Sequence, residues 1–238
     1  GIPQPKPRAS RPVQMVALAV TLIAAAFAVL RLSSGLFTPR ASVTFSGAGV
    51  AQDTWLTREY PDALFDPAFP KIPFKDYSQS HLQYYGASLD RFLIRFDLGA
   101  MPTEAQIQTA ILQIHLETWI SDTGQNSLLR AYPARVTVYR IRRAWQVDSV
   151  TFNAPWSLPG LGIGTDTDAQ PLASVLVSDT VWLEFDITFA ARDWLAHPDE
   201  NWGVVLMITD APEGVAHYWV DTTENPDSER RPRLMLNY

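Results

Sequence analysis

The longest uninterrupted apolar stretch of the chain runs from Val13 to Leu30, and only Gln14 and Thr21 are polar within it. As an α-helix these residues span roughly 27 Å, which is close to the thickness of a bilayer core. A helix in the core of a soluble domain has a polar stripe at a spacing of 3.6 residues, and this stretch has none. We therefore expect a single transmembrane helix over residues 12–32, with Val13 to Leu30 in the lipid bilayer.

The residues around and within this stretch bear on its orientation and processing. Three basic residues precede it in a Pro-rich segment, residues 1–11, and two follow it, which favours a cytoplasmic N-terminal arm. An uncleaved signal anchor in the cell membrane is the preferred interpretation. The alternative is a cleaved signal peptide, because small residues near the end of the stretch also fit a cleavage site. In an anchor, the same small residues permit close packing against other membrane helices: Ala24, Ala25, Ala26 and Ala28.

The charge distribution argues against nucleic acid as a partner. The first 32 residues hold four of the 19 basic residues and none of the 25 acidic ones, so 15 basic and 25 acidic residues remain in the rest of the chain. Contacts to phosphate groups require a basic face. We therefore expect no nucleic-acid binding by residues 33–238.

Cysteine is absent, which excludes disulfides, cysteine-ligated zinc, iron–sulfur clusters, thiol catalysis and covalently attached c-type haem. The four histidines stand in no HExxH or comparable catalytic motif, and His115 is expected to be solvated on an outward strand face. We therefore expect no enzyme activity and no cofactor. The metal candidates are loop carboxylates, which suit calcium, with plain solvated loops as the alternative: Asp166, Asp168, Asp221 and Glu224.

After a linker at residues 33–41, the hydrophobic pattern changes from continuous to alternating. Phe92, Ile94 and Phe96 fall on one face of residues 91–98, which is the period of two expected of a half-buried strand. The same alternation recurs in other segments, and one segment is apolar throughout, which predicts a strand buried on both faces. The alternating segments are residues 107–117, 182–188 and 233–238, and the apolar one is residues 203–208.

Only one short helix is expected in this part of the chain, over Phe189 to Leu195, with Thr188 as its cap. Many short strands joined by long Pro- and Asp-containing connections, with almost no helix between them, argue against a parallel α/β fold. We therefore expect residues 42–238 to form an extracytoplasmic all-β domain, an antiparallel β-sandwich of jelly-roll type.

The order of short segments along the chain carries a family resemblance. The segments are QDTWL (52–56), YYGAS (84–88), RFLIRFDL (91–98), IQTAILQIHLE (107–117), VTVYRIRRAW (136–145), VTFN (150–153), WLEFDIT (182–188), ARDWL (191–195), NWGVVLMI (201–208) and RRPRLMLNY (230–238). In this order they resemble the DNRLRE-type domain family over nearly all of residues 42–238. The resemblance implies a non-catalytic jelly roll related to carbohydrate-binding modules, some of which bind acidic or neutral polysaccharide.

The chain departs from that family pattern in an aromatic-rich insertion at residues 58–85, where the family has a short link. Aromatic rings stiffened by neighbouring prolines lose little entropy on docking, so the insertion suits a protein partner or sugar rings. The alternative is that these rings cover one end of the sandwich. The aromatic residues are Tyr60, Phe65, Phe69, Phe74, Tyr77, Tyr84 and Tyr85.

Seven of the eight tryptophans fall into two groups by their local context. Those in strand-like or helix-like segments are expected in the core: Trp55, Trp145, Trp194 and Trp202. Those at predicted strand ends or in loops are candidates for an exposed indole that stacks on a sugar or anchors an interface: Trp119, Trp156 and Trp219.

The combined expectation is a non-enzymatic, membrane-anchored accessory subunit. Its sandwich would dock on the subunits of an integral-membrane complex, such as an electron-transport assembly, and stabilise them. The grounds are the anchor, the aromatic insertion, and a sandwich that no hydrolase or lyase domain accompanies in this sequence. The main alternative is a cell-surface polysaccharide-binding module. A polysaccharide-degrading enzyme is a distant third, because no pair of catalytic carboxylates stands out.

Overall fold

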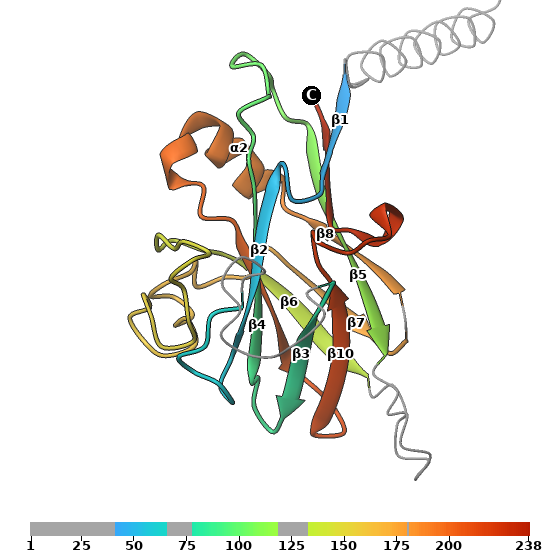
Figure 1. Cartoon of the computed structure of the whole chain (residues 1–238). Helices are drawn as coiled ribbons and strands as arrows, with labels where there is room; N and C mark the ends of the chain where they lie inside the picture. The colour runs from blue at the N-terminus through green and yellow to red at the C-terminus, as the bar shows by residue number, and fades with distance from the viewer. Residues whose placement is uncertain (1–40, 66–77, 119–132, 180) are drawn as a thin grey trace, which may run out of the picture. The chain divides into compact units, whose positions relative to one another are not determined.

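A computed structural model describes residues 41–65, 78–118, 133–179 and 181–238, in which Ala41–Tyr238 forms one compact unit (Figure 1). Two antiparallel sheets pack face to face, so the predicted all-β sandwich is confirmed. The predicted arm and transmembrane helix, with Ala24, Ala25, Ala26 and Ala28, lie outside the described residues. Within the described ranges, no helix has the length and apolar character needed to traverse a bilayer.

The first sheet is organised around one long central strand, β5 (Thr109–Thr118). Its first half pairs with β11 and its last residues with β10, while β8 pairs along the opposite edge. β1 lies outside β11, and β3 lies outside β10. The other strands of this sheet are β1 (Ser42–Ser46), β3 (Gln79–Tyr85), β8 (Val181–Asp186), β10 (Val215–Asp221) and β11 (Arg233–Asn237).

A side-chain network centred on Asp221 fills the gap on β5 between its pairings with β10 and β11. The Asp221 carboxylate is fully buried and accepts hydrogen bonds from four side chains. His115 on β5 is one of the four, with its Nδ1 2.6 Å from Oδ2 of Asp221, so the expectation that His115 is solvated is wrong. The other three donors are Gln79, Asn225 and Arg230.

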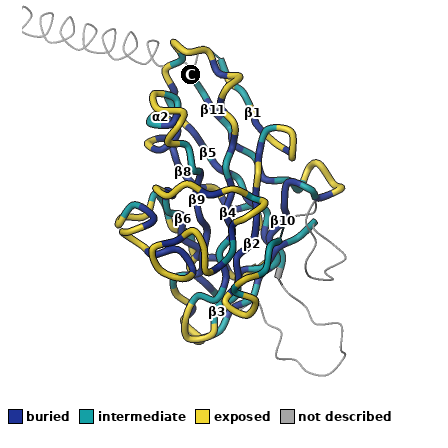
Figure 2. The backbone as a smooth tube through the Cα atoms, turned by 60° about the vertical axis from the view of Figure 1, so that its left-hand side comes forward, coloured by how far each residue is buried: buried dark blue, intermediate teal, exposed yellow. Residues whose placement is uncertain are grey.

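The second sheet has the order β2-β4-β9-β6-β7 in the described part of the chain. β9 is central and is buried along Val204 to Ile208, which confirms the predicted strand with two buried faces. Figure 2 shows these buried strands passing between exposed loops. The strands of this sheet are β2 (Ala51–Thr57), β4 (Asp90–Phe96), β6 (Ala134–Arg140), β7 (Ala173–Val177) and β9 (Val204–Asp210).

The sandwich buries apolar side chains in two separate layers. The main core lies between the sheets and contains the inward residues that the alternation predicts, such as Phe92 and Leu112. The second core covers the outer face of the second sheet, where Leu93 and Val205 contact the segment that follows β6. In this segment VTFN at 150–153 forms no strand; Val150 and Phe152 are buried within irregular backbone.

The predicted short helix is present as α2 (Thr188–Ala196), but the predicted cap is wrong. The backbone N–H of Thr188 donates to the carboxylate of Asp186 at 2.9 Å. The Thr188 hydroxyl instead accepts a hydrogen bond from the backbone N–H of Ala110 on β5, at 2.8 Å. This threonine therefore ties the helix to the first sheet.

The predicted insertion is shorter than residues 58–85, because Gln79–Tyr85 form β3 and pair with β10 along their whole length. Tyr84 is half-buried against the main core, and Tyr85 is exposed at the end of the strand. These two aromatics therefore belong to the sheet rather than to a loop.

Two carboxylates lie buried at the β2 edge of the sandwich. Burial raises the pKa of Asp53 to about 8, and the nearby charge of Glu224 adds to this effect. Burial also raises the pKa of Asp90 to about 7. Neither carboxylate oxygen of Asp90 has a well-formed hydrogen bond among the described residues. The nearby side chains of Thr57 and Trp55 lower the pKa of Asp90, but by less than burial raises it.

Candidate functional site

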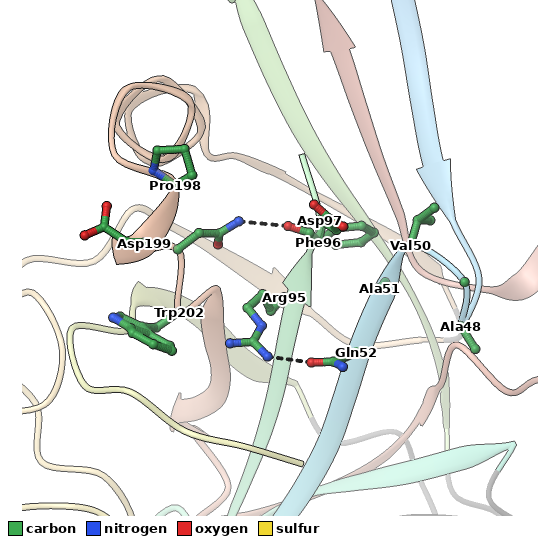
Figure 3. Close-up of a pocket in the computed structure, with 12 residues that line it drawn as sticks. Ala48, Val50, Ala51, Gln52, Arg95, Phe96, Asp97, Pro198, Asp199 and Trp202 are labelled. Carbon is green, nitrogen blue, oxygen red and sulfur yellow. Dashed lines mark hydrogen bonds between the residues drawn. The ribbon is translucent and has the colours of Figure 1, made fainter. Parts of the chain in front are cut away.

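A groove of about 430 Å³ opens at the ends of β2 and β4, on the side of the second sheet that carries the second core (Figure 3). The turn between β1 and β2 forms one wall, and the end of β4 forms the floor. The loop after α2, which includes the 3-10 helix η1 (Pro198–Glu200), forms the other wall. The lining residues are Ala48, Gly49, Val50, Ala51, Gln52, Arg95, Phe96, Asp97, Pro198, Asp199, Asn201 and Trp202.

Arg95 is the central side chain of this groove. The register of β2 and β4 places Gln52 directly opposite Arg95, and Nη2 of Arg95 donates to Oε1 of Gln52 at 2.5 Å. The guanidinium carbon lies 5.0 Å from the ring centre of Trp145 and 5.8 Å from that of Trp202. Figure 3 shows the guanidinium between Trp202 and Gln52. These contacts fix its plane through a hydrogen bond and two cation–π interactions.

The electrostatics of the groove combine one cation with two carboxylates. Burial lowers the pKa of Arg95, and the charge of Asp97 opposes this shift. A guanidinium stays protonated at neutral pH even so. Asp97 and Asp199 are both exposed, so the groove carries a small net negative charge. This net charge disfavours an anionic ligand.

Three contacts hold the wall that carries Trp202. Nε1 of Trp145 donates to the backbone oxygen of Trp202 at 2.7 Å, and Nδ2 of Asn201 donates to the backbone oxygen of Phe96 at 2.8 Å. Gly203 has φ of +71°, and a Cβ there would lie 2.2 Å from the carbonyl oxygen of Ile94. Glycine therefore lets the loop press directly against β4.

The groove brings one aromatic ring together with side chains that donate and accept hydrogen bonds. The partly exposed indole of Trp202 lies in the same lining as amide, guanidinium and carboxylate groups, so the groove offers both stacking and hydrogen bonding. The lining residues include no serine, threonine, cysteine or histidine, and their ionisable side chains are Arg95, Asp97 and Asp199.

The aromatic residues predicted to contact a partner or a sugar differ in exposure, and some of them lie outside the described residues. Tyr60 is exposed, whereas the ring centre of Phe65 lies 4.3 Å from that of Trp55. Trp156 is only 7% exposed and its Nε1 donates to the backbone oxygen of Thr151, so the expectation of an exposed indole there is wrong. Trp219 is partly exposed on the outer face of β10. Phe69, Phe74, Tyr77 and Trp119 lie outside the described residues.

The calcium candidates are occupied by protein partners. Asp166 is buried, accepts from the backbone N–H groups of Ser157 and Gly162, and pairs with Arg143. Asp168 pairs with Arg140 and Arg142, Asp221 lies in the network described above, and Glu224 accepts from the Thr223 hydroxyl. Among the described residues, no group of three or more carboxylate or imidazole side chains converges on a metal position.

The groove is not evident from the sequence pattern. Arg95 lies on the face of β4 opposite to Phe92, Ile94 and Phe96, which the alternation allows, but Trp202, expected in the core, is partly exposed in the groove wall. Trp55, Trp145 and Trp194 are buried as expected. Gln52 and Arg95 are polar residues on the outward faces of two strands, but the sequence does not show that the strand register places them opposite each other. Comparison with models of known families gives no match to this chain, and comparison with curated proteins gives none either.

Proposed function

We propose that residues 41–238 form a non-enzymatic, jelly-roll-type binding module that holds a neutral polysaccharide in the groove beside Arg95. The observation that supports this proposal is the placement of Trp202 and Gln52 on the two sides of the Arg95 guanidinium. An indole face stacks on the apolar face of a sugar ring, while the amide and guanidinium pair with its hydroxyl groups.

The test is affinity electrophoresis of the full-length protein, in mild detergent, through gels that contain a neutral glucan, a neutral mannan or an acidic uronan. We expect retardation by a neutral polymer, and roughly tenfold weaker binding after Trp202→Ala, because one stacking contact is lost. The matched control is Trp182→Ala, which removes a partly exposed tryptophan from the other sheet. No retardation by any neutral polymer, or equal weakening in both variants, would contradict the proposal.

A second candidate function is the accessory subunit of an integral-membrane complex. The described residues that favour it are Leu176 and Val181, which are 57% and 38% exposed on β7 and β8, at the edges of the two sheets. Together with Trp182 they line a groove of about 450 Å³. Exposed apolar strand edges are typical sites of contact between proteins.

This candidate is tested by purification from native membranes in mild detergent, followed by mass spectrometry of whatever remains bound in stoichiometric amount. We expect membrane subunits with the wild-type protein and their loss after Leu176→Lys with Val181→Lys, or after replacement of residues 12–32. Trp202→Ala should leave the complex intact. Recovery of the protein alone would exclude the accessory role and leave the polysaccharide proposal untouched.

A further inference from the structure

Three polar side chains converge on the outer face of β3 and β10, away from the groove. In the register of these strands His217 lies opposite Gln83, and Trp219 lies opposite His81. Nε2 of His217 is 3.2 Å from Nδ1 of His81 and 3.3 Å from the side-chain amide of Gln83. His81, Gln83 and His217 are all partly exposed, so an ion can reach them from solvent.

We propose that His81 and His217, with the side-chain oxygen of Gln83, form a binding site for a divalent transition-metal ion such as Cu²⁺, Ni²⁺ or Zn²⁺. Metal–nitrogen bonds to imidazole are about 2.0–2.1 Å long. With the two nitrogens 3.2 Å apart, an ion at that distance from both subtends an angle of about 100°. This angle lies between those of octahedral and tetrahedral coordination.

Gln83 supplies an independent reason to place a ligand here. Its Oε1 is buried and has no hydrogen-bond partner among the described residues, while its amide nitrogen points at His217. The oxygen and nitrogen of a glutamine amide have nearly the same shape, so a half-turn of the amide exchanges them. That turn places the oxygen 3.3 Å from Nε2 of His217, where it can complete a set of three donors.

The charge state of the two imidazoles suits metal binding. Burial lowers the pKa of His81 to about 3, with a further contribution from His217, and burial lowers the pKa of His217 to about 4. Both rings are therefore neutral at pH 7, as metal ligands must be. Without a metal, one ring donates its N–H to the other. Metal binding requires the proton of His81 to lie on Nε2 and that of His217 to lie on Nδ1, so that the two facing nitrogens are free to bind the ion. This is a change of tautomer, and it releases no proton.

The surroundings hold the rings in place. The ring of Trp219 meets that of His81 edge-on at 4.0 Å, and the ring of Trp55 lies 4.9 Å from it. These contacts limit rotation of the His81 imidazole, as outer-shell groups do at metal sites. Imidazole donors favour copper, nickel and zinc, whereas calcium requires a shell of oxygen ligands. The site therefore differs in kind from the calcium sites considered above.

The experiment is a Cu²⁺ titration of the untagged full-length protein, followed by tryptophan fluorescence and by electron paramagnetic resonance. We expect one ion per chain, quenching of tryptophan emission, and hyperfine coupling to two imidazole nitrogens. His81→Gln and His217→Gln should each weaken binding at least tenfold. His197→Gln, which changes an exposed histidine on the loop after α2, should leave the affinity unchanged.

Two results would overturn the proposal. One is binding that persists in the His81→Gln, His217→Gln double variant. The other is a wild-type spectrum without coupling to two nitrogens, a result that does not depend on how any variant folds.

Discussion

Replacing Asp90 with asparagine tests whether the sandwich holds this carboxylate in a site that disfavours its charge. Burial raises its pKa from 3.8 to about 7, so the folded state binds the proton more tightly than the unfolded state. The contribution of Asp90 to the free energy of unfolding is therefore fully present below about pH 4 and is lost as the pH rises through 7. A shift of about three units corresponds to about 4 kcal/mol, of which roughly 2–3 kcal/mol is lost between pH 5 and pH 8.

Asparagine has nearly the shape of the protonated acid and carries no charge. We expect the unfolding free energy of Asp90→Asn, relative to wild type, to increase by roughly 2–3 kcal/mol from pH 5 to pH 8. The measurement is urea unfolding of the full-length protein at several pH values, followed by tryptophan fluorescence. The contribution of Asp53, whose pKa is also raised, is common to both proteins and cancels in the difference.

The control is Glu213→Gln, which removes a carboxylate that is exposed in the turn between β9 and β10. Its difference from wild type should stay flat over the same range. If the Asp90→Asn difference is equally flat, the buried site does not disfavour the charge, and the reasoning from burial is wrong.

Two further predictions concern the backbone and the polar network. Gly203→Ala should lower the unfolding free energy by at least about 2 kcal/mol more than Gly214→Ala, because both glycines have positive φ but only at 203 does the added Cβ meet backbone. Equal shifts in thermal unfolding would contradict the close approach at Gly203. Asp221→Ala should cost roughly 3–5 kcal/mol, because four side-chain donors lose their buried acceptor, and Asp221→Asn should cost less. A loss below about 1 kcal/mol in guanidinium unfolding would show that the network does not hold the two halves of the sheet together.

The sequence predicted those strands whose faces differ clearly in polarity. Residues 91–98 alternate cleanly, and β4 lies there with Phe92 and Ile94 buried. β3 falls within the predicted insertion, because Ser80 lies on its inward face and the aromatic Tyr85 on its outward face. When both faces mix polar and apolar residues, the alternation is weak, although the backbone pairs like that of any other strand.

Both candidate sites depend on strand register, which the sequence pattern did not reveal. Gln52 and Arg95 meet because β2 and β4 pair in one particular alignment, and the loop that carries Trp202 completes the groove from more than one hundred residues further along the chain. His81 and His217 are 136 residues apart. Local periodicity determines which face a side chain occupies, whereas the partner across the sheet follows from the packing of the whole domain.

The position of β11 constrains the order in which the first sheet can form. This final strand lies between β1 and β5, and among the described strands it is the only one that pairs with β1. β1 therefore gains its strand partner only once β11 has been made, because Val43 pairs with Leu236 from the far end of the domain. Contacts between residues so far apart in the sequence form slowly, so we expect β1 to join the first sheet late in folding.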